Sequence, residues 1–222
     1  MIAAARTRWV TFDCFGTLVD WQAGFTSTLA SLVGTKARDV VRAYHDFERL
    51  SEAERPHLSY RDVLASSLVR AAEEVGAALT RAQAGALACA WESMPLFPDV
   101  ERMLEELRAM GCRLAVLTNC DNDLFEQTHR RFSTPFDLVV TAEQVCDYKP
   151  SLSHFRYFDR VSGVGVGDWI HVGGSVYHDI VPAKKLGIRS VWLDRDDTGE
   201  DPGVATTRVR SALDVPRAIA RL

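Results

Sequence analysis

The sequence predicts an α/β fold with a doubly wound parallel sheet and an all-helical block inserted after the first strand. Three observations predict it. Short apolar, β-prone runs at 9–12, 113–119 and 169–172 alternate with helical patterns in the second part of the chain. Polar residues follow these runs directly, as at the carboxyl ends of parallel strands. Between the first run and the second, about eighty residues show only helical periodicity.

Composition and charge limit the classes of function. With 222 residues, 47% of them hydrophobic and 25% charged, the chain can bury a substantial core. The net charge of −4 comes from mixed acidic and basic residues, so neither nucleic acid nor an anionic membrane is expected as a partner. No apolar run approaches the about twenty residues that cross a bilayer, and the N-terminus lacks the apolar region of a secretory signal. The sequence therefore predicts a cytoplasmic protein that acts on small molecules.

The cysteines do not indicate a disulfide framework or a zinc site. They are odd in number and form no CxxC pair: Cys14, Cys89, Cys112, Cys120 and Cys146. Cys14 lies beside the acid that ends the first strand, which raises the question of a thiol mechanism. No histidine is placed with it by any spacing in the sequence, so we do not favour that mechanism.

The first predicted strand, 9–12, stops at Asp13 and is soon followed by Gly16. Asp13 thus lies at a strand's carboxyl end, where ligands collect in open α/β sheets, and it is a candidate for chemistry. The alternative from local chemistry is an aspartate that caps the turn made by Gly16 and Thr17.

The helical block follows and ends at a linker. Apolar residues at helical spacing predict four helices, near 25–32, 40–50, 60–72 and 82–91. The two prolines of 94–98 break helices and predict the linker. Five arginines of the block are expected to be mostly solvated or ion-paired: Arg38, Arg42, Arg49, Arg55 and Arg61.

After the linker, helix and strand alternate again. A helix that starts at 99 and ends at Gly111 precedes the strand 113–119, whose last residues are Thr118 and Asn119. These two can cap the next helix, near 124–132, or bind an anion at its N-terminus, and both roles can hold together. A strand at 136–140 then leads to Lys149-Pro150, which would ordinarily be a surface lysine.

The last part of the chain is expected to contain one more strand and two helices. The strand 169–172 leaves through Gly173-Gly174-Ser175, and a helix begins at Asp179 and ends at Gly187. The stretch 196–204 is a predicted loop, and a helix at 215–222 closes the chain.

The stretch Asp13-x-Phe15-Gly16-Thr17-Leu18 resembles the first motif of the haloacid dehalogenase superfamily, whose leading aspartate is a covalent nucleophile. Phosphatases of this superfamily carry a second acid two residues later, which protonates a leaving oxygen, and here Phe15 stands in its place. An aromatic residue there is the pattern of the dehalogenases, because halide leaves without a proton. The resemblance implies a Rossmann-like core of residues 1–19 and 98–222, with residues 20–97 as a helical cap.

The other motifs of the superfamily follow in order. Lys149-Pro150 resembles the third motif, in which an ammonium group keeps the nucleophile ionised and oriented. Asp179 resembles the acid that orients this lysine and a water molecule. Gly174 replaces a carboxylate that holds magnesium in the phosphatases, so we expect no metal and no cofactor. The implied catalytic residues are Asp13, Lys149 and Asp179.

The resemblance also implies a set of substrate contacts, with Thr118 and Asn119 on the anionic group of the substrate. Arg42 is the closest positional match to the cap arginine that holds the departing halide, and Ser175 takes the polar role of an asparagine. The full expected set is Cys14, Phe15, Thr17, Arg42, Thr118, Asn119 and Ser175. His178 is a candidate for a catalytic base, but a histidine beside a helix start is more often a surface or capping residue.

The segments 175–183 and 191–195 look like the type II haloacid dehalogenases. The expected activity is metal-independent hydrolysis of a short 2-haloalkanoic acid through an aspartyl ester, by a homodimer acting on a small anionic substrate. Two alternatives stay open. The first is a related hydrolase that cleaves a C–N bond or acts on another small acid through the same aspartyl ester. The second is a catalytically impaired relative that only binds a small ligand, which Gly173-Gly174 suggests. Phosphatase activity is the least favoured of these functions.

Overall fold

The computed structural model describes residues 8–222, so the first seven residues of the predicted core lie outside it. One sheet of six parallel strands has the order β3-β2-β1-β4-β5-β6. The strands are β1 (Trp9–Phe12), β2 (Arg113–Thr118), β3 (Leu138–Thr141), β4 (Trp169–Gly173), β5 (Arg189–Leu193) and β6 (Thr207–Val209). The chain order reverses between β1 and β4, and such a switch point is where open α/β sheets bind ligands. The predicted doubly wound α/β fold is confirmed.

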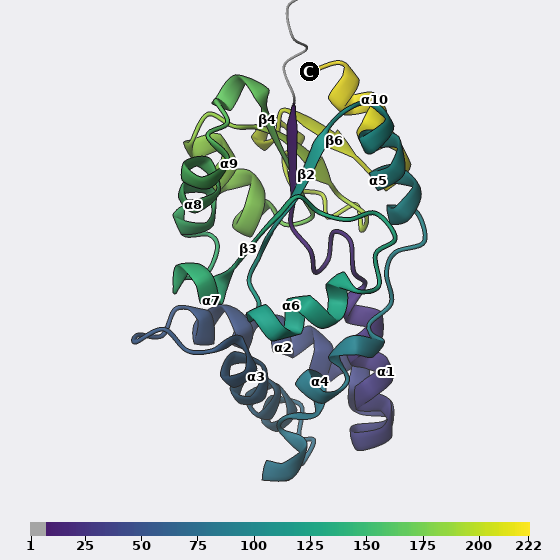
Figure 1. The fold of residues 1–222 in the computed structure, drawn as a ribbon. Coiled ribbons are helices and arrows are strands. Elements are labelled where there is room, and N and C mark those ends of the chain that lie inside the picture. The colour runs from purple at the N-terminus through teal and green to yellow at the C-terminus, as the bar shows by residue number, and fades with distance from the viewer. Residues whose placement is uncertain (1–7) are drawn as a thin grey trace, which may run out of the picture.

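Helices cover both faces of this sheet (Figure 1). α8 (Ser153–Ser162) and α9 (Val181–Lys185) lie on one face, and α5 (Val100–Ala109) and α10 (Val215–Ala220) on the other. β1 serves both layers because its side chains alternate. Trp9 packs against Phe158 of α8, with ring centroids 5.2 Å apart, whereas Val10 and Phe12 join the core under α5 and α10.

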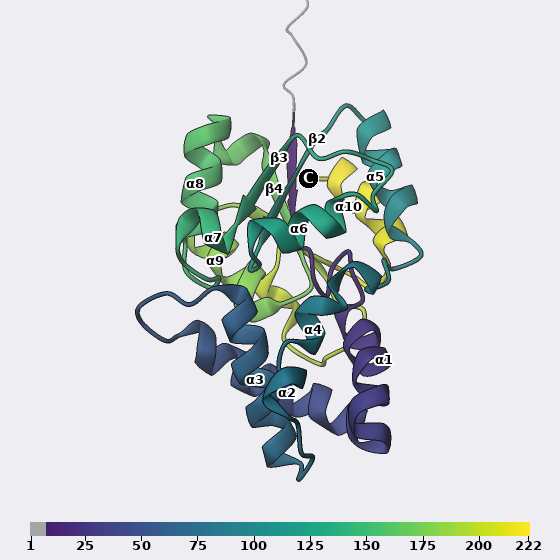
Figure 2. The ribbon, with the colours of Figure 1, turned by 60° about the horizontal axis from the view of Figure 1, so that its bottom comes forward.

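The helical block lies beyond the carboxyl ends of the central strands (Figures 1 and 2). Its α-helices are α1 (Trp21–Val33), α2 (Ala37–Glu52), α3 (Tyr60–Glu74) and α4 (Ala86–Cys89). The remaining helices, α6 (Asn122–His129) and α7 (Ala142–Val145), follow β2 and β3. No helix within residues 8–222 has both the length and the apolar character needed to span a membrane.

The two passages between the sheet and the helical block lie side by side. Val19 on the way out bridges Leu96 on the way back in antiparallel fashion. Phe97 N donates to Leu18 O at 3.0 Å, and Asp20 N donates to Pro95 O at 2.9 Å. The predicted linker at 94–98 is therefore a paired crossing rather than a free loop.

Two predicted elements differ from the structure, and two strands, β5 and β6, were not predicted. The expected helix at 82–91 is interrupted, with 3₁₀ turns at Arg81–Gln83 and Trp91–Ser93 on either side of α4. The second turn lets Trp91 become buried against Phe15, so tertiary packing overrides local helical propensity here. The helix expected to start at Asp179 begins instead with a π-helical turn, Val176–Ile180. The short edge strand β6 was not predicted, since three residues give too little alternation to detect.

Candidate active site

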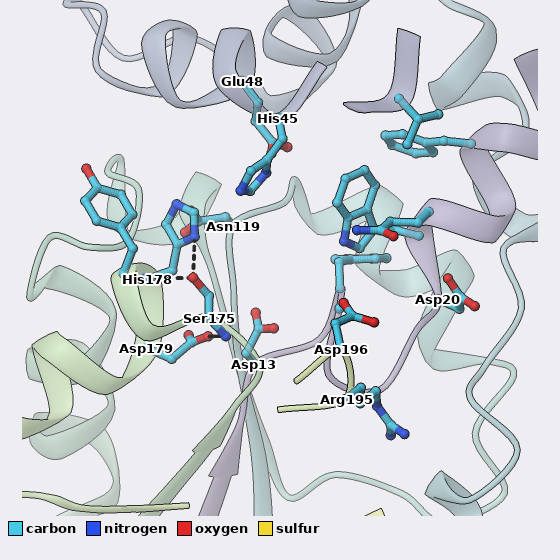
Figure 3. Close-up of a pocket in the computed structure, with 18 of the residues that line it drawn as sticks. Asp13, Asp20, His45, Glu48, Asn119, Ser175, His178, Asp179, Arg195 and Asp196 are labelled. Atoms are coloured by element: carbon cyan, nitrogen blue, oxygen red, sulfur yellow. Dashed lines mark hydrogen bonds and ion pairs between the residues drawn. The ribbon is translucent and has the colours of Figure 1, made fainter. Parts of the chain in front are cut away.

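A cleft of about 1210 Å³ lies between the carboxyl edge of the sheet and the helical block. The sheet side contributes Asp13, Lys149 and Asp179, and α2 contributes much of the opposite wall. In Figure 3 Asp13 points up into this space, with Asp179 and Ser175 on one side and Glu48 and His45 above. The three predicted catalytic residues are thus brought to one cleft at the switch point.

Asp13 is held by its neighbours at the end of β1. Its backbone N–H donates to Val172 O of β4 at 3.0 Å, which extends the strand pairing by one residue. Thr17 Oγ1 donates to Asp13 Oδ2 at 2.7 Å and itself accepts from the Gly174 N–H at 2.8 Å. The loop turns back because Gly16 has φ of +94°, a conformation that other residues rarely adopt. One carboxylate oxygen is thereby fixed by the chain that follows it.

Lys149 joins the two carboxylates. Its fully buried Nζ donates to Asp13 Oδ1 at 2.9 Å and to Asp179 Oδ1 at 2.7 Å. Asn119, at the end of β2, holds the lysine backbone from both sides. Its Oδ1 accepts from Lys149 N at 2.7 Å, and its Nδ2 donates to Lys149 O at 3.1 Å. Asn119 therefore has a positioning contact that its sequence motif did not indicate.

Asp179 is buried at the π-helical turn and held by three groups. The Ser175 N–H donates to its Oδ2 at 3.2 Å, and Lys149 and His171 approach Oδ1. His171 Nε2 lies 3.4 Å from Oδ1, while its Nδ1 lies 2.9 Å from Thr11 Oγ1. His171, on β4, was not predicted as a site residue, because only the tertiary fold brings it to the carboxylate.

Burial and ion pairing shift the pKa values of this triad in different directions. Burial raises the pKa of Asp13 above its ordinary value, although Lys149 opposes that shift. Burial acts on Asp179 in the same sense, but Lys149 and His171 outweigh it and hold the pKa of Asp179 well below its usual range. Burial alone would lower the pKa of Lys149, yet the two carboxylates raise it. As pH falls, Asp13 is therefore protonated before Asp179, and Lys149 keeps its charge.

The geometry does not fit a divalent cation at this position. A Cβ on Gly174 would lie 2.8 Å from Gly16 O, and a Cβ on Gly173 would lie 2.4 Å from Asp179 Cβ. The position of Gly174 therefore has no room for the acid that the phosphatase motif requires there. In the described part of the chain, no three His, Cys, Asp or Glu side chains group in a way that could hold a metal.

Five of the residues predicted to contact substrate line the cleft: Phe15, Arg42, Thr118, Asn119 and Ser175. The Phe15 ring packs against Trp91, with centroids 4.6 Å apart. Arg42 lies at the edge, where its side chain is 81% exposed and pairs with Asp39 at 3.4 Å. Its halide-binding role stays a prediction.

Two residues predicted to contact substrate lie behind the cleft wall instead. Cys14 is fully buried in the hydrophobic core, and Thr17 is buried under Asp13. Burial also raises the pKa of the Cys14 thiol well above its ordinary value, which keeps it protonated. A thiolate mechanism is therefore disfavoured at Cys14, and Thr17 acts on the carboxylate rather than from the cleft surface.

The wall formed by α2 contains polar residues that sequence reasoning did not assign. Glu48 Oε1 accepts from Tyr44 at 3.1 Å and from Tyr60 at 2.6 Å, and Glu52 Oε1 accepts from Asn119 Nδ2 at 2.9 Å. Tyr44, Glu48 and Glu52 recur at intervals of four, so they share one helical face. That spacing was the available signal, since acids on an otherwise apolar face need a reason to be there.

The family model for haloacid dehalogenase-like hydrolases matches residues 10–193. The chain belongs to this family and is a hydrolase. The match spans β1 to β5 and thus covers Asp13, Lys149 and Asp179.

Solved structures of dehalogenases share the fold across nearly the whole chain. An L-2-haloacid dehalogenase from Xanthobacter autotrophicus, with chloropropionic acid covalently bound, has a TM-score of 0.84, 17% identity and coverage of 96% of this chain and 98% of its own. The L-2-haloacid dehalogenase RSc1362 has a TM-score of 0.86, 20% identity and coverage of 96% and 99%. At these identities the likeness establishes the fold.

Sequence relatives include phosphatases as well as a dehalogenase. The phosphoserine phosphatase of Thermus thermophilus is 35% identical over 136 residues, which are 60% of this chain and 55% of that enzyme. The chain thus matches only about half the length of this phosphatase. The (S)-2-haloacid dehalogenase of Pseudomonas sp. strain YL is 19% identical over 217 residues, which are 93% of each chain.

Proposed function

We propose that this hydrolase is a dehalogenase of short 2-haloalkanoic acids that works through an ester of Asp13 and without a metal. The observation that carries the proposal is Gly174, where the phosphatase motif has a magnesium-binding acid: a Cβ there would lie 2.8 Å from Gly16 O, so the acid has no room. Phe15 supports it, because it replaces the acid that an oxygen leaving group requires. The dehalogenase folds that cover the whole chain support it further.

The proposed reaction has two steps. An Asp13 carboxylate oxygen attacks C2 in line, the C2–halogen bond breaks, and its electron pair leaves with the halide. Water, oriented by Asp179, then adds to the Asp13 carbonyl carbon. The ester bond breaks, the 2-hydroxy acid and a proton are released, and the Asp13 carboxylate is restored. Thr118, Asn119 and Ser175 line the cleft and are proposed to bind the carboxylate of the substrate. Holding the reactants in line can contribute about 7–11 kcal/mol towards the barrier.

We also propose that residues 20–97 act as a cap on the core and that two chains form a homodimer. The arrangement of α1 to α4 over the carboxyl edge of the sheet supports a cap. Sedimentation velocity on the purified chain tests the dimer, and a single species of monomer mass at micromolar concentration would contradict it.

A screen for halide release tests the activity itself. We expect halide from chloro- or bromoacetate, or from one enantiomer of 2-chloropropionate, with the rate unchanged by a chelator. Fluoroacetate completes the series. Phosphate hydrolysis is the competing candidate because of the 35% identity to a phosphatase. Turnover of phosphate esters that rises with added magnesium, without halide release from any haloacid, would replace our proposal.

The ester intermediate is tested by a single turnover in heavy-oxygen water with enzyme in excess. We expect the label in the Asp13 carboxyl group and none in the first hydroxy acid, because the product takes its oxygen from Asp13. Label in the product, with Asp13 unlabelled, would show that Asp13 acts only as a base. Asp13→Asn is expected to be inactive by either route, so the position of the isotope decides.

A further inference from the structure

A polar cluster on the wall opposite Asp13 has no part in the dehalogenation described above. α2 contributes His45, Glu48 and Glu52, and the π-helical turn after β4 contributes His178. In Figure 3 His45 and Glu48 project towards the space above Asp13, and His178 stands at its side next to Asn119. A halide leaves as a stable anion and needs no proton donor. The cluster therefore points to leaving groups of another kind.

The two glutamates of this cluster have different partners. Glu48 is held by the hydroxyl groups of Tyr44 and Tyr60. Glu52 instead reaches the sheet side of the cleft, where its Oε1 accepts from Asn119 Nδ2 at 2.9 Å. Its other oxygen, Oε2, lies 3.6 Å from His178 Nε2. Glu52 is thus oriented by the same Asn119 that holds the backbone of Lys149.

His178 is held by Ser175 on its Nδ1 side and faces Glu52 with its Nε2. Ser175 Oγ accepts from the His178 backbone N–H at 3.1 Å and lies 3.1 Å from the ring Nδ1. The side chain is 13% exposed, and within residues 8–222 its Nε2 is buried without a hydrogen-bond partner. The 3.6 Å separation from Glu52 is longer than a hydrogen bond, as is common for catalytic pairs before substrate binds. The ring therefore holds Nε2 towards Glu52, at the boundary between α2 and the sheet side of the cleft.

Electrostatics favour the cationic form of His178, in which Nε2 carries a proton. Burial alone would lower the pKa of His178, but Glu52 raises it above its ordinary value. Other titratable groups also face the ring: Glu48 and His45 from α2, Asp179 and Tyr177 from its own turn, and Lys149. A cationic imidazole can donate through Nδ1 to Ser175 and still carry a proton on Nε2, on the side of Glu52.

We propose that His178, oriented by Glu52, is a general acid that allows the Asp13 ester chemistry to expel oxygen leaving groups, so that the enzyme also hydrolyses short acids with an aryloxy group at C2. The inference rests on the proposed function, since it needs the same ester. The proton donor that phosphatases place two residues after the nucleophile comes here from a different element, because Phe15 cannot supply it. A cleft of about 1210 Å³ has room for an aromatic leaving group as well as a three-carbon acid.

The proposed hydrolysis of an aryloxy acid has two steps and consumes only water. The Asp13 oxygen forms a bond to C2 as the C2–O bond to the aryl group breaks, and the departing oxygen takes the electron pair and the Nε2 proton of His178. A phenol leaves. Water then adds to the Asp13 carbonyl carbon, and one of its protons passes to the neutral His178. The ester C–O bond breaks, the remaining proton goes to the hydroxy acid, and the Asp13 carboxylate and the cationic imidazole are restored.

The test compares 2-bromo-, 2-(4-nitrophenoxy)- and 2-phenoxypropionate in wild type and His178→Asn. The ratio kcat/KM reports the steps up to departure of the leaving group. Because general acid catalysis contributes about 10²–10⁴-fold, we expect kcat/KM of the variant to fall about 100-fold or more for phenoxide. The loss should be smaller for nitrophenoxide and smallest for bromide. His129→Asn, on α6 and stacked on Phe125, is the matched control and should leave all three ratios unchanged.

Glu52→Gln provides a second readout. Glutamine keeps a carbonyl oxygen for Asn119 but removes the charge that favours the cationic imidazole. In the wild type, phenoxide release should decline as pH rises through the raised pKa of His178, since the acid form is lost. The variant should show this decline at lower pH. A Glu52 that is only structural would lower the rate by the same factor at every pH.

The outcomes separate the inference from the proposed function. Equal losses for the three leaving groups in His178→Asn would overturn the inference, as would bromide release by the wild type without any phenol from the aryloxy acids. Either result leaves the dehalogenase proposal standing, provided that heavy oxygen enters Asp13 from the bromo acid. If Asp13 stays unlabelled with that substrate, the proposed function fails, and the inference fails with it.

Discussion

At the scale of single residues, one ammonium group serves two buried carboxylates. Lys149 is fully buried, and Asp13 and Asp179 are its two acidic partners. The triad carries a net negative charge when all three groups are ionised, so the lysine is the element that makes burial of both acids tolerable. Its removal affects the charge, the orientation and the stability of the proposed nucleophile together.

We expect Lys149→Met to lower kcat/KM by at least about 100-fold, because methionine has similar length but leaves Asp13 without the cation that keeps it ionised. Breaking a buried ion pair in this way should also cost about 3–5 kcal/mol in the free energy of unfolding. Lys185→Met, at an exposed position of α9, is the control. Steady-state kinetics and denaturant unfolding measure both effects. A methionine variant with most of its activity would make Lys149 a packing residue.

The pH dependence of halide release follows from the raised pKa of Asp13. The proposed nucleophile must be ionised, so activity should be present above this pKa and decline as pH falls through it, at a pH higher than for an ordinary aspartate. Asp179 should not limit this range, since its pKa is lowered. A profile of kcat/KM against pH measures the decline. An activity that stays constant down to the ordinary aspartate pKa would argue against Asp13 as the group that titrates.

The paired glycines after β4 give a prediction about metal. Gly174→Asp restores the residue type of the phosphatase motif, but its Cβ would lie 2.8 Å from Gly16 O. We expect the variant to lose about 1–3 kcal/mol of stability through overpacking and to gain no magnesium-dependent activity. Thermal unfolding and a magnesium titration test this, with Gly165→Asp as the control, since a Cβ there meets nothing within 4 Å. Phosphatase activity in the stable variant would mean that the loop can adapt.

The sequence predicted the site residues that belong to motifs, but not the residues that hold them in place. Asp13, Lys149 and Asp179 were predicted as a group, and the structure brings them together, although their roles stay predictions. His171 and Glu52 were not singled out. Each contacts the site across a large separation in sequence or through a tertiary hydrogen bond, and no local spacing encodes such a contact.

At the scale of elements, an acid from the sheet side caps a helix of the inserted block. Asp121, which follows β2, accepts from Tyr60 N at 2.9 Å and from Arg61 N at 3.0 Å, at the start of α3. The first backbone N–H groups of a helix have no partners within it, so this carboxylate serves as an N-terminal anion. The contact also ties α3 to the carboxyl edge of the sheet.

We expect Asp121→Ala to lower the free energy of unfolding by about 1–2 kcal/mol, in the range of lost N-caps. The variant should also raise KM, because α3 supports the wall that contains Tyr60 and Glu48. Asp123→Ala removes only the more exposed ion pair with Arg61 and should change stability by less than about 1 kcal/mol. Urea unfolding of the two variants measures the difference. Equal effects would show that α3 docks without this cap.

Element boundaries were best predicted where the local pattern agrees with the packing. The first strand was predicted at 9–12 and observed at Trp9–Phe12, because its apolar run is bounded by Asp13 and is buried on both faces. The helix near 82–91 was too long in the prediction, since burial of Trp91 requires a tighter turn than an α-helix gives. The π-helical turn before α9 has no sequence signature of its own.

At the scale of the whole molecule, one hydrophobic cluster runs through both the sheet layer and the helical block. It contains Val10 and Phe12 of β1 and also Tyr44 and Leu64 of the block. A continuous core should make the two parts unfold together. We expect a single transition in urea, with tryptophan fluorescence and far-ultraviolet circular dichroism coinciding. Two separate transitions would mean that the block and the sheet are independent folding units.

The paired crossing at Val19 and Leu96 has a consequence for how such a protein can change over evolutionary time. Because the chain leaves and re-enters the sheet layer at adjacent, hydrogen-bonded positions, the ends of the inserted block are already closed against each other. The entropy of closing a loop grows only with the logarithm of its length, so blocks of different size can be exchanged here at little cost to the sheet. Asp13, Lys149 and Asp179 lie outside the block, and Glu52 lies within it. Related proteins can therefore keep the proposed nucleophile Asp13 while the helical block is replaced in a single genetic step. We propose that this block, through Glu52, helps to determine which leaving group is expelled.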